Sequence, residues 1–288
     1  MLSTQWSTGQ DLLDLLGEEE VETEYVNASF KTSRVINAQS LENTAPGVLD
    51  LKISHRFGLL STGFYEIFGL DAATIRIGFD YGLNDRIMVG VGRSSFQKTY
   101  DGFVKAKLLR QSIGKKTFPF SLLWYSGMTI NTLKREKEDE KEVLDFKHRL
   151  TYTHQLIIGR KFSDSFSLQL MPTYVHRNLV GANIEENGVL IFGAATRLKI
   201  SKRVAINLEY HYILPDQVAD NIKNSLSIGF DIETGGHVFQ LHFTNSTSMV
   251  DKGYLTETAN DWLNGDIHFG FNISRVFTIT NPKHKKRK

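Results

Sequence analysis

The sequence predicts an all-β fold: a transmembrane antiparallel up-and-down β-barrel of about 12 strands. Three observations lead to this prediction. From residue 48 onward, apolar and polar residues alternate with a period of two, which is the pattern of a strand between two different environments. The alternating segments are close to the roughly 9–11 residues that a tilted strand needs to cross a bilayer. Short connections also alternate with long ones.

The first predicted strand, residues 48–57, shows the pattern clearly. Leu49, Leu51 and Ile53 share one face, while Asp50 and Lys52 share the other. The same alternation predicts eleven further strands, at residues 73–81, 86–94, 99–109, 118–130, 148–160, 166–176, 189–200, 204–212, 224–234, 237–245 and 267–277.

Alternation alone does not distinguish a soluble sandwich from a membrane barrel, but the connections do. One set is mostly short, at residues 82–85, 110–116, 161–165, 201–202 and 235–236. The other set is long, apart from residues 95–98, and consists of residues 58–72, 131–147, 177–188, 213–223 and 246–266. Short turns on one rim and long loops on the other are typical of outer-membrane barrels. We therefore expect short periplasmic turns, longer extracellular loops and both chain ends on the periplasmic side.

The chain divides into four predicted parts. Residues 1–10 are either the remnant of a signal peptide or a plain terminus, residues 11–47 form a periplasmic or lumen-plugging segment, residues 48–278 form the transmembrane barrel, and residues 279–288 form a basic disordered tail. Within the second part, residues 24–36 are strand-like, but Lys31 and Arg34 interrupt their apolar faces. The sequence leaves open whether this run lies in the lumen or below the barrel.

The charge and cysteine content exclude several functions. The net charge of +2 is set by the tail, where five of the last six residues are lysine or arginine. No basic patch with interleaved aromatic residues supports nucleic-acid binding, so we expect none. The absence of cysteine excludes a disulfide framework, thiolate metal sites and thiol catalysis.

Several stretches resemble an uncharacterised family of outer-membrane β-barrels, known only as a domain of unknown function. The similar stretches are residues 29–36 (SFKTSRVI), 51–58 (LKISHRFG), 75–95 (IRIGFDYGLNDRIMVGVGRSS) and 101–109 (DGFVKAKLL). The resemblance covers most of the chain from about residue 25 to 278 and implies a membrane barrel in the outer membrane. Its motifs include no known catalytic residue, so it implies nothing about an activity.

Charged residues on the lumen side of the predicted strands are the candidate functional residues. Ten are candidates for solute selection: Lys52, Arg56, Arg76, Asp80, Lys105, Lys107, Arg149, Arg197, Glu209 and Asp231. With Lys199, Asp50 and Glu233 included, the strand positions predicted to face the lumen carry eight positive and five negative charges. This balance predicts a weak preference for anions if the lumen conducts. The same charges could instead form ion pairs that fill a closed lumen.

Three histidines, His211, His242 and His268, also have lumen parity. No close spacing on one strand fixes a coordination geometry, so neither a metal nor a cofactor is predicted. A barrel lipase would need a serine, a histidine and an orienting group at one rim, and the sequence does not single out such a set, so an enzyme is not expected.

Three interpretations of function remain. The first is a channel or small-solute transporter in the outer membrane, in contact with membrane lipid and with a small polar or anionic solute. The second is a non-conducting barrel that anchors or assembles periplasmic or surface proteins. The third is a soluble β-rich binding protein.

Overall fold

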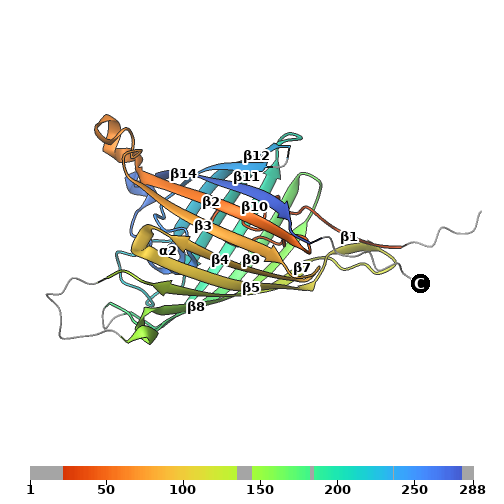
Figure 1. Ribbon diagram of the computed structural model, residues 1–288, viewed down its shortest axis with the longest axis horizontal. Coiled ribbons are helices and arrows are strands. Elements are labelled where there is room, and N and C mark those ends of the chain that lie inside the picture. The colour runs from red at the N-terminus through yellow and green to blue at the C-terminus, as the bar shows by residue number, and fades with distance from the viewer. Residues whose placement is uncertain (1–21, 135–144, 182–184, 236, 281–288) are drawn as a thin grey trace, which may run out of the picture.

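The computed structural model describes residues 22–134, 145–181, 185–235 and 237–280. The predicted segment 1–10 and most of the basic tail therefore lie outside the described residues. Twelve antiparallel strands close into one barrel, which confirms the predicted fold class and every predicted barrel strand (Figure 1). The strands are β2 (Val48–Leu59), β3 (Ala73–Gly82), β4 (Ile87–Ser94), β5 (Thr99–Leu109), β7 (Ser121–Asn131), β8 (Leu150–Lys161), β9 (Phe166–Arg177), β10 (Gly188–Lys199), β11 (Val204–Ile213), β12 (Ser225–Thr234), β13 (His237–Thr244) and β14 (His268–Thr278).

Each barrel strand pairs with the next one along the chain, and the ring closes between β14 and β2, where Phe277 lies opposite Leu49. The remaining elements are short. Strands β1 (Thr23–Tyr25) and β6 (Ser112–Gly114) form a separate two-stranded sheet. The helix α2 spans Asp251–Thr256, and 3₁₀ helices span Leu60–Glu66, Phe96–Lys98, Phe146–Arg149 and Trp262–Asn264. Among the described residues, no helix has the length and apolar character needed to cross a membrane.

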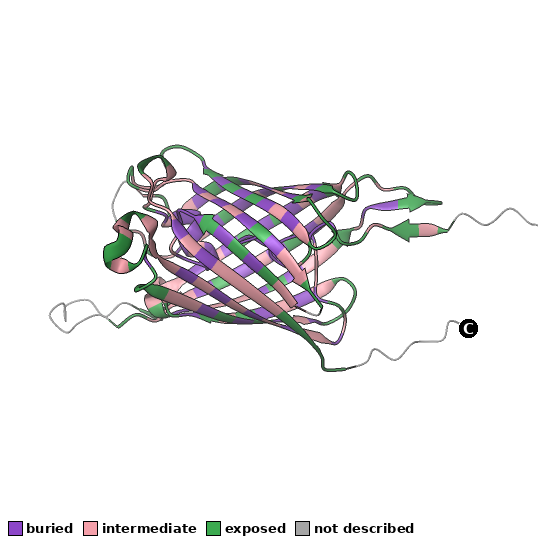
Figure 2. Cartoon of the chain, turned by 90° about the horizontal axis from the view of Figure 1, so that it is seen from above, coloured by how far each residue is buried: buried purple, intermediate pink, exposed green. Residues whose placement is uncertain are grey.

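The two faces of each strand differ as a membrane barrel requires. Arg76 faces the lumen and is 1% exposed, whereas its neighbour Ile77 faces outward and is 42% exposed. The alternation of buried and exposed residues is visible along the whole wall (Figure 2). Exposed apolar side chains cover the outer surface of the strands, for example Val91, Leu190, Phe192 and Leu241. In water such a surface would be unfavourable, but against lipid it is the stable arrangement.

The two rims differ in the same way as the connections. The β1–β6 sheet and the C-terminal end of the described chain lie at one end of the barrel, whereas the helix α2 and the long loops lie at the other (Figure 1). We refer to these ends as the periplasmic end and the outer rim, following the usual orientation of such barrels.

Most strand boundaries differ from the sequence prediction by one to three residues, and two of the differences move residues that the prediction named. The alternation predicts Phe118 and Phe120 within a strand, but β7 begins only at Ser121, and residues 110–120 contain the short strand β6. Arg149 was predicted to face the lumen. It lies instead in the 3₁₀ helix before β8, and its side chain donates to the carbonyl oxygens of Asn131 and Leu133 at the outer rim.

Candidate functional site: the plugged lumen

The interior of the barrel is filled largely by residues 29–46, which we call the plug. Five of its apolar side chains are almost completely buried: Phe30, Val35, Ile36, Ala38 and Leu41. They form one apolar cluster with lumen-facing wall residues, namely Met88, Phe103, Leu123, Tyr125, Ile157, Met171 and Ala195. The apolar residues that point into an otherwise polar lumen are therefore the binding surface for the plug.

The plug folds back on itself inside the barrel. The amide of Val35 donates to the carbonyl of Ala38 at 2.8 Å, and the amide of Ser40 donates to the carbonyl of Ser33 at 3.0 Å. This pairing places a tight turn at residues 35–38. The chain leaves the plug at Gly47, which has a φ of +73° and approaches Thr280 too closely to carry a side chain. Glycine is the residue that tolerates both conditions.

The turn is held by a fully buried carboxylate of the wall. One oxygen of Glu209 on β11, Oε2, accepts the backbone N–H groups of Ile36, Asn37 and Ala38 at 3.1, 3.0 and 3.0 Å. Its other oxygen lies 3.4 Å from Nε2 of His211. A buried carboxylate is costly without such donors, and three converging amides replace much of its lost hydration. Glu209 therefore binds the plug through the peptide backbone.

A fully buried cation holds the other side of the plug. Nζ of Lys105 donates to the carbonyl oxygens of Ser33, Ser40 and Glu42 at 3.0, 3.2 and 2.6 Å, and lies 3.2 Å from Oε1 of Gln39. All four acceptors belong to the plug. In the ring of strands, β5 and β11 are nearly opposite. The wall thus presents a positive charge to plug carbonyls on one side and a negative charge to plug amides on the other.

Further wall side chains, neutral and charged, complete the contacts. Gln169, Gln240 and Asn272 donate to the plug carbonyls of Gln39, Val35 and Ile36 at 2.7, 2.5 and 3.2 Å. Side-chain contacts are also made by three further pairs: Ser33–Asp80 (2.8 Å), Asn37–Arg56 (2.6 Å) and Asn37–Ser227 (3.1 Å). The partners come from β2, β3, β5, β9 and each of β11 to β14, so the plug contacts the wall around most of its circumference.

The candidate selectivity residues are brought together only in part. Eight of the ten are buried in the lumen, Lys107 is partly buried, and Arg149 lies outside it as described above. Most of the cations are paired. The ion pairs are Arg76–Asp101, Lys52–Asp50 (2.8 Å), Lys107–Glu42 (3.8 Å), Arg197–Glu233 (3.5 Å) and Arg197–Asp231 (4.0 Å). Arg56 and Lys105 have no carboxylate within salt-bridge distance in the described chain.

Sequence reasoning missed two charged residues of the lumen. Asp101 on β5 binds the guanidinium of Arg76 through both carboxylate oxygens and neutralises it. Arg177, at the end of β9, is buried and pairs with Glu185 at 3.2 Å. Both residues occupy lumen-facing positions in the alternation of their strands, so this alternation could have identified them.

The loop between β13 and β14 enters the lumen from the outer rim. Tyr254 and Leu255 of α2 are buried against Val175, Val189, Ile191 and Ile213 of the wall. Asp251 of the same helix accepts hydrogen bonds from Tyr125 and, at 3.2 Å, from Tyr254. Burial raises the pKa of Asp251, and the positive charge of Arg34 in the plug opposes this rise. The plug and α2 therefore meet the same layer of the barrel from opposite ends.

The three lumen histidines do not form a metal site. His211 and His242 are completely buried, and His268 lies close to Asn260 and to the carbonyl of Phe57. Within the described part of the chain, no group of three or more His, Asp or Glu side chains could hold a metal ion.

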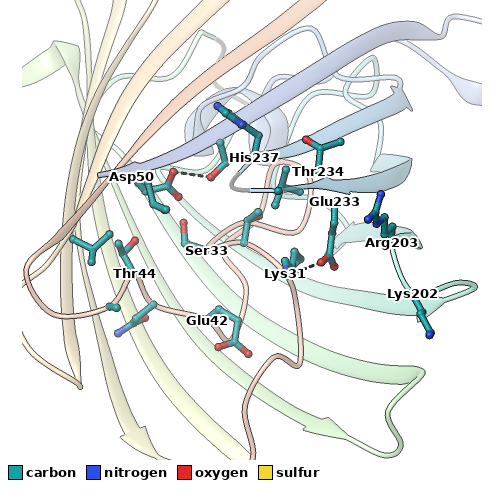
Figure 3. Close-up of a pocket in the computed structure, with 18 residues that line it drawn as sticks. Lys31, Ser33, Glu42, Thr44, Asp50, Lys202, Arg203, Glu233, Thr234 and His237 are labelled. Carbon is teal, nitrogen blue, oxygen red and sulfur yellow. Dashed lines mark hydrogen bonds and ion pairs between the residues drawn. The ribbon is translucent and has the colours of Figure 1, made fainter. Parts of the chain in front are cut away.

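A cavity of about 760 Å³ lies between the plug and the wall at the periplasmic end (Figure 3). We call it the vestibule. Lys31 crosses from the plug to Glu233 on β12, 2.6 Å away, and Arg203, Lys202 and His237 line the wall. A cavity of this volume is large enough for a small organic solute. It ends at the plug and not at an open pore.

One family model matches most of the chain, and its description agrees with the fold. The family described as "Membrane bound beta barrel domain (DUF5777)" matches residues 30–277, which confirms the resemblance noted in the sequence. Among solved structures, the NanC porin is 8% identical, with 80% of this chain and 98% of that chain covered and a TM-score of 0.49. The Acinetobacter baumannii outer membrane protein Omp33 is 10% identical, with 80% and 97% covered and a TM-score of 0.40. Among curated proteins, none matches the sequence.

Proposed function

We propose, from the premise that this chain belongs to the membrane-bound β-barrel family DUF5777, that it is a channel which the plug closes in its resting state. The barrel lies in the outer membrane, as its apolar outer surface, its polar lumen and its family indicate. In the proposed open state, the plug leaves the lumen and a small polar or anionic solute passes through.

The observation that carries this proposal is the polar character of the plug contacts. Lys105 and Glu209 are buried charges whose partners are mainly backbone groups of the plug. A barrel that only had to be filled would gain from apolar residues at these positions, because burying a charge costs several kcal/mol. The charges are useful if water replaces the plug, since both side chains then line a hydrated pore.

Release of the plug would also change the charge balance of the lumen. Lys107 would lose Glu42, while Arg56 and Lys105 would lose their plug acceptors. On the negative side, Asp80 and Glu209 would lose Ser33 and the turn amides, while Glu233 would lose Lys31 but keep its ion pair with Arg197. Release therefore leaves three cations and two carboxylates of the lumen without an ion-pair partner, which favours a weak preference for anions. Charges interact over about 8 Å at physiological salt, so only those near the narrowest part select.

Conductance in planar bilayers tests this function. We expect the full chain to be closed and a variant that lacks residues 1–46 to conduct steadily, with a reversal potential in a salt gradient that indicates anion preference. Lys105→Glu with Lys107→Glu in the shortened chain should convert this to cation preference. Lys202→Glu, at the exposed β10–β11 turn, is the matched control and should have a smaller effect.

The helix α2 favours a second candidate, a non-conducting barrel that serves as an anchor or assembly partner. Tyr254 and Leu255 of this helix pack against the wall at the outer rim and fill part of the lumen that the plug does not contact. If a folded barrel without residues 1–46 and with the α2 loop shortened still does not conduct, the channel proposal is wrong and the anchor remains.

A further inference from the structure

The outer surface of the barrel contains a groove of about 490 Å³ across β7 to β11. Its lining is mostly aromatic and aliphatic: Trp124, Leu156, Pro172, Tyr174, Leu190, Phe192 and Leu214. Most of these side chains point away from the lumen and toward the surrounding lipid. The groove lies on the opposite side of the wall from the plug and α2, so it has no part in the proposed channel.

A polar pair lies beside the apolar lining. Oγ of Ser126 on β7 lies 3.1 Å from Nδ1 of His154 on β8, and the two residues are direct cross-strand partners. Both have outward parity, and His154 is exposed. When the serine donates this hydrogen bond, the ring carries its proton on Nε2, and the described residues supply no acceptor for it. Hydrocarbon offers no hydrogen bond either, so the donor is unsatisfied unless a lipid supplies an acceptor.

The backbone is interrupted at the same place. Pro172 has no N–H group to donate to a neighbouring strand. The pairing of β8 with β9 includes Gln155 with Thr173 and Ile158 with Leu170, but no partner for Leu156 or Ile157 between them. This interruption lies within the groove.

The position of His154 indicates which part of a lipid it meets. Its cross-strand partner on β9 is Tyr174. Tyr152 and Tyr212 also face outward near the outer-rim ends of their strands. Tyrosine rings on a membrane protein prefer the interface between headgroups and acyl chains. The ester carbonyls of membrane lipids occupy this layer, immediately above their acyl chains.

We infer that the groove binds a membrane lipid with ester-linked acyl chains. One acyl chain lies along the apolar lining, and Nε2 of His154 donates a hydrogen bond to the ester carbonyl oxygen of that chain. Ser126 positions the ring by fixing which of its nitrogens carries the proton.

The test uses Trp124 as a reporter inside the groove, in a variant with Trp6→Phe and Trp262→Phe. The protein is reconstituted in phosphatidylcholine vesicles that contain increasing amounts of phosphatidylethanolamine with dibrominated chains, which quench tryptophan on contact. The chains are joined either by ester bonds or by ether bonds, which lack the carbonyl. We expect the ester lipid to quench Trp124 with about fivefold higher apparent affinity, which corresponds to about 1 kcal/mol at 25 °C for one hydrogen bond.

Two variants make the test specific. His154→Leu should abolish the difference between the ester and ether lipids. His55→Leu is the matched control, because His55 is also an outward-facing histidine but stacks on Phe271 away from the groove, and it should keep the difference. The proposal is overturned if wild-type protein does not distinguish the two lipids, if His154→Leu still distinguishes them, or if His55→Leu removes the difference as well.

Discussion

Neutralising Glu209 should loosen the plug without disturbing the barrel. Its Oε2 atom accepts three backbone N–H groups of the turn at residues 36–38, and each bond is stronger for a charged acceptor than for a neutral one by about 1 kcal/mol. Glu209→Gln keeps a neutral acceptor and removes the cost of burying a charge, which offsets part of the loss. We expect a net loss of about 2 kcal/mol in the free energy of plug binding, or about thirtyfold more frequent release.

Because the chain contains no cysteine, a single introduced thiol can report this release. Ser40→Cys places the thiol at a plug position that is completely buried. Maleimide should label it about thirtyfold faster in the Glu209→Gln background, while the heat stability of the barrel in detergent changes little. Asp50→Asn is the charge-matched control, since Asp50 is a buried wall carboxylate whose partners, Lys52 and Ser274, both belong to the barrel. Equal labelling in wild type and Glu209→Gln, or equal acceleration by Asp50→Asn, would refute the reasoning.

Three further predictions concern the wall and α2. Ile77→Arg should destabilise the barrel by about 2–4 kcal/mol in a urea titration, because residue 77 faces lipid. Arg76→Ile should cost about 3 kcal/mol by leaving Asp101 buried and unpaired. The double variant Arg76→Ile with Asp101→Leu should recover most of this loss, and no recovery would show that the pair is unimportant. Burial raises the pKa of Asp251 above its ordinary value of 3.8, so its contribution to stability is full below that value and is lost as pH rises through the raised pKa. The midpoint temperature of thermal unfolding should therefore decrease as the pH rises from about 4 to about 7. The decrease should be larger in wild type than in Asp251→Asn, and identical profiles would contradict this.

The barrel could be predicted from the sequence because its wall separates two media. Each strand must alternate between lipid and lumen, so the alternation is repeated twelve times and single exceptions do not hide it. The errors lie at strand ends, where the alternation stops. Arg149 continues the parity of β8 by one residue, but its side chain turns to the carbonyls of a neighbouring loop.

The position of the plug was harder to predict, for a physical reason. Glu209 and Lys105 bind backbone groups, which every residue possesses, so no complementary side-chain pattern in residues 29–46 indicates these contacts. A signal was nevertheless present. Leu123, Ile157 and Met171 are apolar residues at lumen-facing positions, where contact with water would be unfavourable. Likewise, Val189 and Ile191 indicated that something apolar covers the outer half of the lumen.

The two-stranded sheet of β1 and β6 determines how a mechanical force on the N-terminal end would reach the plug. Three residue pairs join the two strands outside the barrel, and the ring of Tyr25 stacks under Arg110. A pulling force would first separate β1 from β6 and only then act on the plug. Since the plug enters and leaves at the periplasmic end, its contacts would then rupture one after another, from Lys31 at the entrance to Asn37 at the turn. Peeling requires only the force that breaks the strongest single contact, so the plug can resist heat as a whole and still yield to a weak, directed pull.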